Sequence, residues 1–366
     1  MKKVFFTYTL ILTIAVLAIG AGFLARFFSE RFSNNSSRSA VISQSLDEKV
    51  ALGERVASGE KVVKQSAIST QEKNNKSVKL IFVGDIMLDR GVKSIVMKYG
   101  GGDFTFPFQK IKPTLDTADF VFGNLEGPLS DQGSNTGKLY SFRMPSEAVN
   151  GLKYASFKAL SGANNHSDDW GRTAIKDTRD RLLAAGILPL GIGTEEEAYA
   201  PKLIDIRGIK ITLLAFTDFD VLEAKGEQIG AALAREEKIS GAIEQAKANY
   251  ANLIIVSFHF GEEYMAQESR RQEKLARFAI DKGADLVIGH HPHVVQPLKQ
   301  YKGKYIAYSL GNFVFDQNFS EDTKHGGLLI VEADLNGITS AELKQIEFNK
   351  YFQPQLVDSN DVIFPK

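Results

Sequence analysis

Short apolar runs alternate with amphipathic helical patterns along most of this chain, and this alternation most restricts its fold. Runs that are apolar at successive positions are typical of parallel strands, which are buried on both faces of a sheet. The alternation therefore predicts an α/β fold. The strand runs lie at residues 78–84, 119–123, 157–163, 252–260 and 285–290, and the helical patterns at 173–186, 235–250 and 270–283.

The second half of the chain is predicted to contain additional strands. Residues 200–216 form two apolar runs on either side of Arg207 and Gly208, which is the pattern of a hairpin. We therefore expect an α/β architecture with a sheet-rich second half. Antiparallel strands are also predicted at residues 304–315, 326–335 and 338–351.

The N-terminus carries a long apolar run. Residues 4–24 contain no charged side chain, and about 20 apolar residues suffice to cross a bilayer. This run is longer than the roughly 7–15 residues of a signal-peptide core. Its length favours an uncleaved transmembrane anchor at residues 1–26, with a cleaved signal as the alternative. In both cases we expect the main domain to be extracytoplasmic, and the anchor would make this a single-pass protein of the cell membrane.

The predicted anchor is followed by a polar segment, residues 27–77, whose low apolar content is typical of a flexible tether. The globular domain is predicted to span residues 78–353, with a C-terminal tail at 354–366. The chain contains no cysteine, which excludes disulfides, thiolate zinc sites and cysteine nucleophiles. The formal net charge is zero, so nothing favours a nucleic-acid partner.

Polar side chains are concentrated directly after the predicted strands, where α/β folds usually bind ligands. Each cluster alone could be a turn or a helix cap, but one shared site at a sheet edge explains all of them together. Imidazole and carboxylate groups bind divalent cations, so we expect a site for Mn, Zn, Fe or Mg. The clusters contain Asp85; Asn124 and Glu126; Asn164, Asn165, His166, Asp168 and Asp169; His259, Glu262 and Glu263; His290, His291 and His293; and Asn312 and Asp316.

A centre of this kind could hydrolyse a phosphate ester. A divalent ion lowers the pKa of bound water, and two ions can clamp the attacking and leaving oxygens. A histidine outside the coordination sphere could then protonate the leaving group. His166 is our candidate for this general acid, with Asp169 orienting its ring. Alternatively, His166 caps a helix that begins near Thr173, or packs under Trp170.

Six stretches carry most of these polar residues: VGDIMLDRGV (83–92), FGNLEGPLS (122–130), ANNHSDDWG (163–171), FHFGEEY (258–264), GHHPHVVQP (289–297) and YSLGNFVFDQ (308–317). Together they resemble the CapA family of poly-γ-glutamate capsule synthesis proteins. The resemblance implies a metallophosphoesterase-like sandwich of mixed β-sheets flanked by helices. It also implies a role in the synthesis or export of an anionic capsule polymer, with other capsule-synthesis membrane proteins as candidate partners.

The wider calcineurin-like phosphoesterases resemble this sequence in their metal-binding motifs. Asp85 matches their first metal-ligand Asp, and His259 matches their lone metal-ligand His. Two positions differ, because Met87 stands where these enzymes usually have His and Asn124 stands where they have a bridging Asp; Glu126 could supply the missing charge. The resemblance implies one or two divalent ions. The implied ligands are Asp85, Asn124, Glu126, Asn165, His259, His291 and His293.

Three functions remain open at this point. The first is a membrane-anchored, extracytoplasmic CapA-like protein that acts on or escorts an anionic polymer with the help of a divalent metal. The second is a metal-dependent phosphoesterase, and the third is a non-enzymatic polymer-binding module whose histidines hold no metal. For the first two, substrate binding is assigned to the neighbouring polar residues Arg90, Glu263, His290, Asn312 and Asp316.

Overall fold

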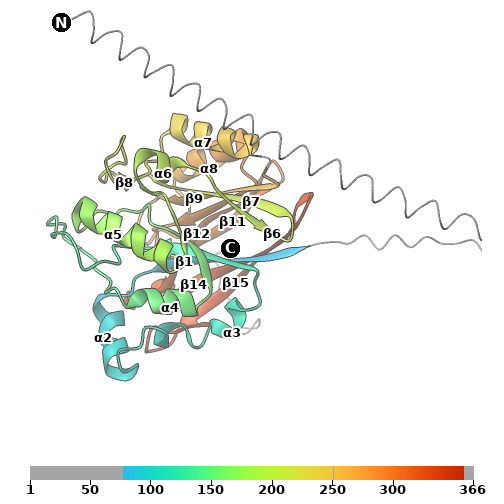
Figure 1. Cartoon of the computed structure of the whole chain (residues 1–366). Helices are drawn as coiled ribbons and strands as arrows, with labels where there is room; N and C mark the ends of the chain where they lie inside the picture. Colours follow the sequence, from blue (N-terminus) through green and yellow to red (C-terminus); the bar gives the residue numbers. More distant parts are fainter. Residues whose placement is uncertain (1–76, 250, 358–366) are drawn as a thin grey trace, which may run out of the picture. The chain divides into compact units, whose positions relative to one another are not determined.

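The computed structural model describes residues 77–249 and 251–357 of the chain. In this part, two β-sheets lie against each other and helices cover their outer faces (Figure 1). The predicted anchor and nearly all of the predicted tether lie outside the described residues. Within the described ranges, no helix combines the length and the apolar character that crossing a bilayer requires.

The first sheet contains eight strands. On one side of β1, the strands β2, β3 and β4 run parallel to it. On the other side, β14, β15 and β16 continue the sheet as antiparallel strands, and the short strand β13 also pairs with β1. The strands are β16 (Pro354–Leu356), β15 (Gly337–Phe348), β14 (His325–Asp334), β1 (Val78–Ile86), β2 (Phe120–Leu125), β3 (Phe157–Ser161), β4 (Leu188–Leu190) and β13 (Asn312–Val314).

The second sheet contains six strands. Its four central strands are parallel, and an antiparallel strand closes each edge. In order across the sheet, the strands are β11 (Val295–Tyr301), β12 (Lys304–Leu310), β10 (Leu286–His290), β9 (Leu253–His259), β7 (Ile209–Thr217) and β6 (Lys202–Ile206). A separate two-stranded sheet pairs β5 (Ile192–Gly193) with β8 (Gly230–Ala231).

Helices pack on the outer face of each sheet. The first sheet packs against one group of helices, and the second sheet against α6, α7 and α8 (Figure 1). The first group comprises α2 (Arg90–Tyr99), η1 (Phe106–Phe108), α3 (Lys112–Leu115), α4 (Ala148–Tyr154) and α5 (Gly171–Ala184). The remaining helices are α6 (Glu195–Tyr199), α7 (Glu236–Ala248), α8 (Arg270–Lys282) and α9 (Glu321–Lys324).

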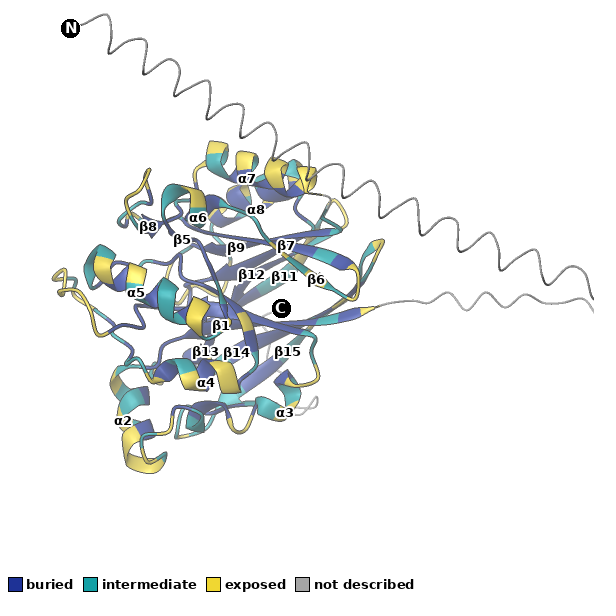
Figure 2. Ribbon diagram, in the orientation of Figure 1, coloured by how far each residue is buried: buried dark blue, intermediate teal, exposed yellow. Residues whose placement is uncertain are grey.

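The central strands, such as β1, β2, β9 and β10, are apolar at successive positions because both of their faces are buried (Figure 2). Along β1, Leu80 and Phe82 pack into the layer between the two sheets. Their neighbours Ile81 and Val83 pack against the helices on the outer face. The alternation of side chains along a strand thus fills two separate cores, as the sequence pattern predicts.

The predicted α/β architecture is confirmed. All five apolar runs form strands, and the three helical patterns form α5, α7 and α8. The predicted hairpin is β6–β7, whose turn residues Arg207 and Gly208 have φ angles of 56° and 88°. Positive φ at both positions is typical of the two-residue turns that match strand twist.

The prediction of one antiparallel strand at residues 304–315 is correct only in part, because β12 pairs antiparallel with β11 but the stretch is not a single strand. The stretch forms β12 in the second sheet and β13 in the first, and β12 runs parallel to β10 while β13 runs parallel to β1. The chain changes sheets at Gly311, whose φ of 62° favours glycine. The predicted tail also begins with an ordered segment, because Pro354–Leu356 form the edge strand β16.

Candidate metal centre

Asp85 lies at the carboxyl end of β1 and is fully buried. The pairing of β1 with β2 is irregular between Phe82 and Asp85, and such irregularities change the direction of a side chain. Gly84 allows the backbone of β1 to approach the sheet crossover, since a Cβ at this position would lie 1.9 Å from the Gly311 carbonyl oxygen. The Asp85 backbone N–H donates to that carbonyl at 2.9 Å.

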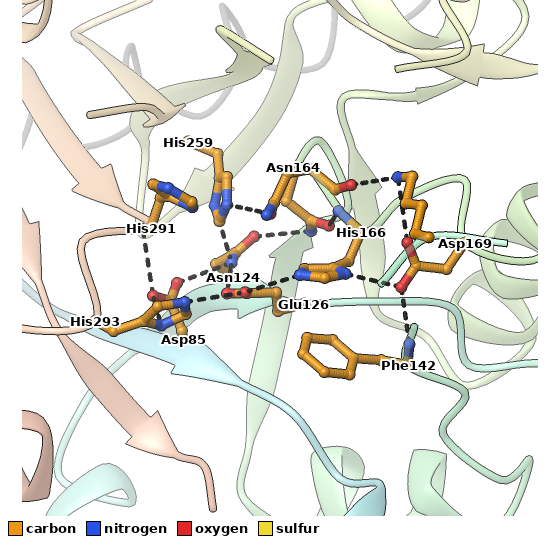
Figure 3. Close-up of polar contacts among 12 residues, drawn as sticks. Asp85, Asn124, Glu126, Phe142, Asn164, His166, Asp169, His259, His291 and His293 are labelled. Carbon is orange, nitrogen blue, oxygen red and sulfur yellow. Dashed lines mark hydrogen bonds and ion pairs between the residues drawn. The ribbon is translucent and has the colours of Figure 1, made fainter. Parts of the chain in front are cut away.

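The end of β10 and the segment after it bring two imidazole rings and one backbone N–H to Asp85. The His291 backbone N–H donates to Asp85 Oδ2 at 3.2 Å. The Nδ1 atoms of His290 and His293 lie 3.5 and 3.4 Å from the Asp85 carboxylate. His291 and His293 have φ angles of 99° and 59°. This left-handed backbone turns both rings toward the same cluster (Figure 3).

Asn124 and Glu126, at the end of β2, form the second side of the cluster. The Asn124 Nδ2 atom donates to Asp85 Oδ1 at 2.8 Å and lies 3.3 Å from both Glu126 Oε2 and His259 Nδ1. His293 Nε2 lies 3.5 Å from Glu126 Oε1. His293 therefore lies between two buried carboxylates, Asp85 and Glu126 (Figure 3).

His259, at the end of β9, links the cluster to the loop after β3. Its Nε2 atom lies 2.8 Å from Asn165 Oδ1. Burial and then the neighbouring His291 lower the pKa of His259 well below its ordinary value. Burial and then His293 lower the pKa of His291 to about 3. Both rings are therefore neutral near pH 7, and neutral imidazole is the form that binds a metal.

The two buried carboxylates have opposite pKa shifts. Burial raises the pKa of Asp85, but the adjacent His290 and His293 outweigh burial and hold it well below its ordinary value. Burial and then the charge of Asp85 raise the pKa of Glu126 well above its ordinary value. The folded chain therefore favours the protonated form of Glu126.

Two groups of donor atoms in the described residues could hold a cation. The first contains Asp85, Glu126 and His293, and in each group the donor atoms lie within 4.8 Å of one another. Within the described residues, Glu126 Oε1 and His291 Nδ1 have no hydrogen-bond partner. Buried polar atoms are rarely left unpaired, so these two atoms and the mixed imidazole–carboxylate donors fit a divalent ion. The second group contains Glu263, His291 and His293.

His166 and Asp169 lie beside this cluster and contact each other. His166 Nδ1 lies 2.8 Å from Asp169 Oδ2, and the same oxygen accepts the Phe142 backbone N–H at 2.8 Å. The His166 ring packs against Phe142 with a centroid distance of 4.0 Å and a tilt of 33° between the ring planes. His166 Nε2 points toward Glu126, with 4.0 Å between Nε2 and Oε1 (Figure 3).

The structural alternatives for His166 do not match this geometry. Helix α5 begins at Gly171, its N-cap is Trp170, and no side chain caps it. The ring of His166 packs against Phe142 rather than under Trp170. Asp169 fixes Nδ1, which leaves Nε2 available on the side of the cluster. The arrangement is compatible with a proton donor, and that role remains a prediction.

A cavity of about 280 Å³ opens beside the cluster. His166 and His293 line it, together with three of the predicted substrate-binding residues, Arg90, Glu263 and Asp316. Arg90 forms an ion pair with Asp316, whose Oδ2 also accepts the Gly91 backbone N–H at 3.0 Å. Asp316 therefore positions Arg90 at the cavity wall.

The other two predicted substrate-binding residues, His290 and Asn312, do not line the cavity, and both side chains are fully buried; their substrate-binding role stays a prediction. His290 lies behind Asp85, and Asn312 Oδ1 lies 3.0 Å from His293 Nδ1. In both cases the residue supports a cluster member rather than facing the cavity. The sequence shows that each follows a strand, but it does not show which side of that strand end faces solvent.

All seven predicted metal ligands lie in this one cluster, and their role as ligands remains a prediction. The network also contains Asn164, which the predicted ligand set omits. Its Nδ2 atom donates to Asn124 Oδ1 at 3.1 Å and to the Leu125 carbonyl at 2.8 Å. Asn164 follows β3 as closely as Asn165 does, so its place in the sequence is enough to predict that it belongs to the cluster. Phe142 lies in the long connection between β2 and α4, and no sequence pattern there predicts its contact with His166.

The fold and the cluster define an α/β protein with a candidate site for a divalent metal at the carboxyl ends of its strands. The chain belongs to the family described as bacterial capsule synthesis protein PGA_cap, whose sequence model matches residues 79–317. This match confirms the family that the six sequence stretches indicate.

Two relatives support the assignment. The capsule biosynthesis protein CapA of Bacillus anthracis is 36% identical over 285 residues, which are 75% of this chain and 68% of the relative. The PGA biosynthesis protein CapA of Bacillus subtilis is 34% identical over 275 residues, which are 74% of this chain and 71% of the relative.

Among solved structures, a phosphatase from Mycoplasma pneumoniae aligns with a TM-score of 0.48 and 15% identity, covering 76% of this chain and 96% of the phosphatase. The NAD nucleotidase of Haemophilus influenzae aligns with a TM-score of 0.43 and 13% identity, covering 78% of this chain and 54% of the nucleotidase.

Proposed function

We propose that this chain acts in the synthesis or export of an anionic capsule polymer of the poly-γ-glutamate type, and that it uses a divalent metal. Membership of the capsule synthesis family supports the biological role. The position of His293 supports the metal: its Nδ1 atom lies 3.4 Å from the Asp85 carboxylate and its Nε2 atom lies 3.5 Å from the Glu126 carboxylate.

The residues at this centre would have three different roles: binding the ion, orienting its ligands and binding the substrate. Asp85, Glu126 and His293 would hold the ion, with His291 and His259 as further imidazole donors. Asn124 and Asn312 would orient the donors through their hydrogen bonds to Asp85 and His293. A bound divalent ion would supply Lewis acidity and would lower the pKa of a bound water. Arg90, at the cavity wall, would bind an anionic group of the substrate.

We also propose that the protein is held in the cell membrane with this domain on the outside. The support is the sequence of residues 4–24, which lack any charge. Carbonate-washed membranes should retain the full chain. Release of a mature form that begins near Ala21 to Ala25 would show a cleaved signal instead. Other capsule-synthesis membrane proteins are the proposed partners and should copurify from mild detergent.

Complementation tests the capsule role. In Bacillus subtilis cells that lack their CapA relative, the wild-type chain should restore secreted poly-γ-glutamate, and His293→Asn should not. Asp119 directly precedes β2, at the edge of the sheet opposite the cluster. Asp119→Asn therefore serves as the matched control and should restore the polymer. If the wild-type chain is produced in the membrane but restores no polymer, the proposed role in poly-γ-glutamate synthesis is wrong.

A second candidate function is metal-dependent hydrolysis of a phosphate ester, in a domain of the metallophosphoesterase type. It is favoured by one observation: His166 is oriented by Asp169, lines the cavity and points Nε2 toward Glu126. His166 would donate a proton from Nε2 to the leaving oxygen. The purified full-length chain should then hydrolyse simple phosphate monoesters or diesters only when Mn or Zn is added. Equal rates with a chelator would exclude this activity.

A further inference from the structure

We propose that Glu263 is a metal ligand of this centre, acting with His291 and His293, and that Tyr264 positions its carboxylate. The sequence alone assigns Glu263 to substrate binding, and the two roles make different predictions. The proposal rests on the proposed function, because it requires that the centre bind a divalent ion. It adds a ligand that reaches the buried histidines from an exposed loop.

The donor atoms of Glu263, His291 and His293 all lie within 4.8 Å of one another. The two histidines are buried, whereas Glu263 is exposed. They come from adjacent loops, because β9 and β10 are parallel neighbours with His259 paired to His290. A hydrogen bond ties the loops together, since the Tyr264 backbone N–H donates to the Pro292 carbonyl at 2.8 Å.

The backbone around these donors is held in a conformation that side chains disfavour. Tyr264, His291 and His293 have φ angles of 63°, 99° and 59°. Left-handed backbone at non-glycine residues persists only where the surroundings impose it, and it concentrates at functional sites. Here it brings the glutamate loop and the histidine loop to the same point.

A chain of hydrogen bonds connects His293 to Tyr264. Asn312 Nδ2 donates to Gln317 Oε1 at 3.1 Å and to the Thr323 carbonyl, so Asn312 Oδ1 is left to accept from His293 Nδ1 at 3.0 Å. Gln317 Nε2 then donates to the Tyr264 hydroxyl at 3.2 Å. These directions leave the lone pair of His293 on Nε2, on the side of Glu126.

The same chain places the Tyr264 hydroxyl proton beside Glu263. Because the hydroxyl oxygen accepts from Gln317, its own proton is free to be donated to a carboxylate. The hydroxyl is in hydrogen-bond contact with the Glu263 carboxylate. Tyr264 thereby joins two members of the donor group, His293 and Glu263, through Gln317 and Asn312.

The electrostatics of the cluster also call for a cation at this point. Asp85 and Glu126 belong to one donor group and Glu263 to the other, and the two groups share His293. Within the described residues, His291 Nδ1 and Glu126 Oε1 have no hydrogen-bond partner, and both side chains are more than nine-tenths buried. An ion among these groups would relieve the repulsion and satisfy the unpaired atoms.

Metal binding to the full-length chain tests the proposal, with Zn and Mn as separate probes. Bound ions are counted by elemental analysis after dialysis, and Kd is measured by competition with a chelating dye. Glu263→Gln should weaken binding by at least about 100-fold, and Tyr264→Phe by about 10–100-fold, as expected for the partner of a ligand. Glu262→Gln removes the neighbouring carboxylate and should leave Kd unchanged.

The possible results separate this proposal from the proposed function. If the wild-type chain binds neither ion, the proposed metal centre and the role of Glu263 both fail. If the wild-type chain binds an ion and Glu263→Gln binds it equally well, only the role of Glu263 fails. Weaker binding by Glu262→Gln to the same degree would show a general loss of negative charge and would also overturn the proposal. The melting temperature of each metal-free variant should match that of the wild type.

Discussion

The two edges of the sheets use the same kinds of side chain in opposite ways. At the amino-terminal edge, Asp119 Oδ2 and Asp285 Oδ2 each accept a backbone N–H from a neighbouring strand at 2.9 Å. Their other oxygens form ion pairs with Arg207 and Lys304. At the carboxyl-terminal edge, Glu126 Oε1 has no hydrogen-bond partner among the described residues.

This difference shows which acidic residues serve the fold and which are available for chemistry. A carboxylate whose oxygens already pair with a backbone N–H and with a Lys or Arg side chain stabilises the strands and has few lone pairs left to bind a ligand. A buried carboxylate without such partners costs stability unless a ligand completes it. Residue type and position next to a strand are alike at both edges, so the hydrogen-bond partners make the distinction.

The largest expected effect is the loss of metal on changing His293. His293→Asn removes the imidazole between Asp85 and Glu126, and bound Zn or Mn should fall to background in elemental analysis. Asp119→Asn, at the opposite edge, should retain the wild-type metal content. Equal metal content in the two variants would contradict the proposal that only the carboxyl-terminal edge binds metal.

The next effect concerns turnover rather than binding. His166→Asn should lower the rate on any identified substrate by about 10²–10⁴-fold, as expected for the loss of a general acid, while metal content stays near wild type. His259→Asn should lower metal content directly. If the His166 variant loses metal as readily as the His259 variant, His166 is a ligand; if it keeps full activity, His166 is structural.

Glu126 gives a smaller effect with a distinctive pH dependence. Its pKa in the folded protein is above the ordinary value of 4.5, so the folded state binds this proton more tightly than the unfolded state. The contribution of Glu126 to stability therefore falls as pH rises above 4.5.

In thermal melts at neutral pH, metal-free Glu126→Gln should be more stable than the metal-free wild type. With Zn or Mn added, the wild type should gain stability and the variant should gain much less. A metal-free variant that is less stable than wild type at neutral pH would argue that Glu126 is satisfied in the fold.

The smallest effect is expected at the amino-terminal edge. Asp285→Ala removes the acceptor of the Ile254 backbone N–H and the partner of Lys304. The free energy of unfolding should drop by about 1–3 kcal/mol, the usual cost of leaving a buried donor unpaired. Denaturant melts measure this change, and metal content should not move. A change in metal affinity here would show that the two edges are coupled.

The sequence predicts the five buried apolar strands, the helices α5, α7 and α8, and the convergence of the polar clusters because these depend on local patterns. Burial on both faces produces apolar runs such as residues 78–84, and parallel strands bring their carboxyl ends to one edge. The sequence also predicts His166 with Asp169, since the two lie only three positions apart.

The remaining details depend on contacts between distant parts of the chain. Gly311 carries the chain from one sheet to the other, so residues 304–315 form two strands rather than one. His290 and Asn312 face the interior because of how the two sheets meet. The connection from Glu263 through Tyr264 to Gln317 joins segments more than fifty positions apart. None of these follows from the periodicity of a single segment.

The measurement that tests the account most directly is metal binding by the wild-type full-length chain, followed as a change in stability. Zn or Mn at a hundredfold excess over Kd should raise the free energy of unfolding by about 2.7 kcal/mol, and elemental analysis should find one or two ions per chain. An unchanged melting temperature together with no bound divalent ion would contradict the account, and would leave the clustered histidines as a hydrogen-bonded core.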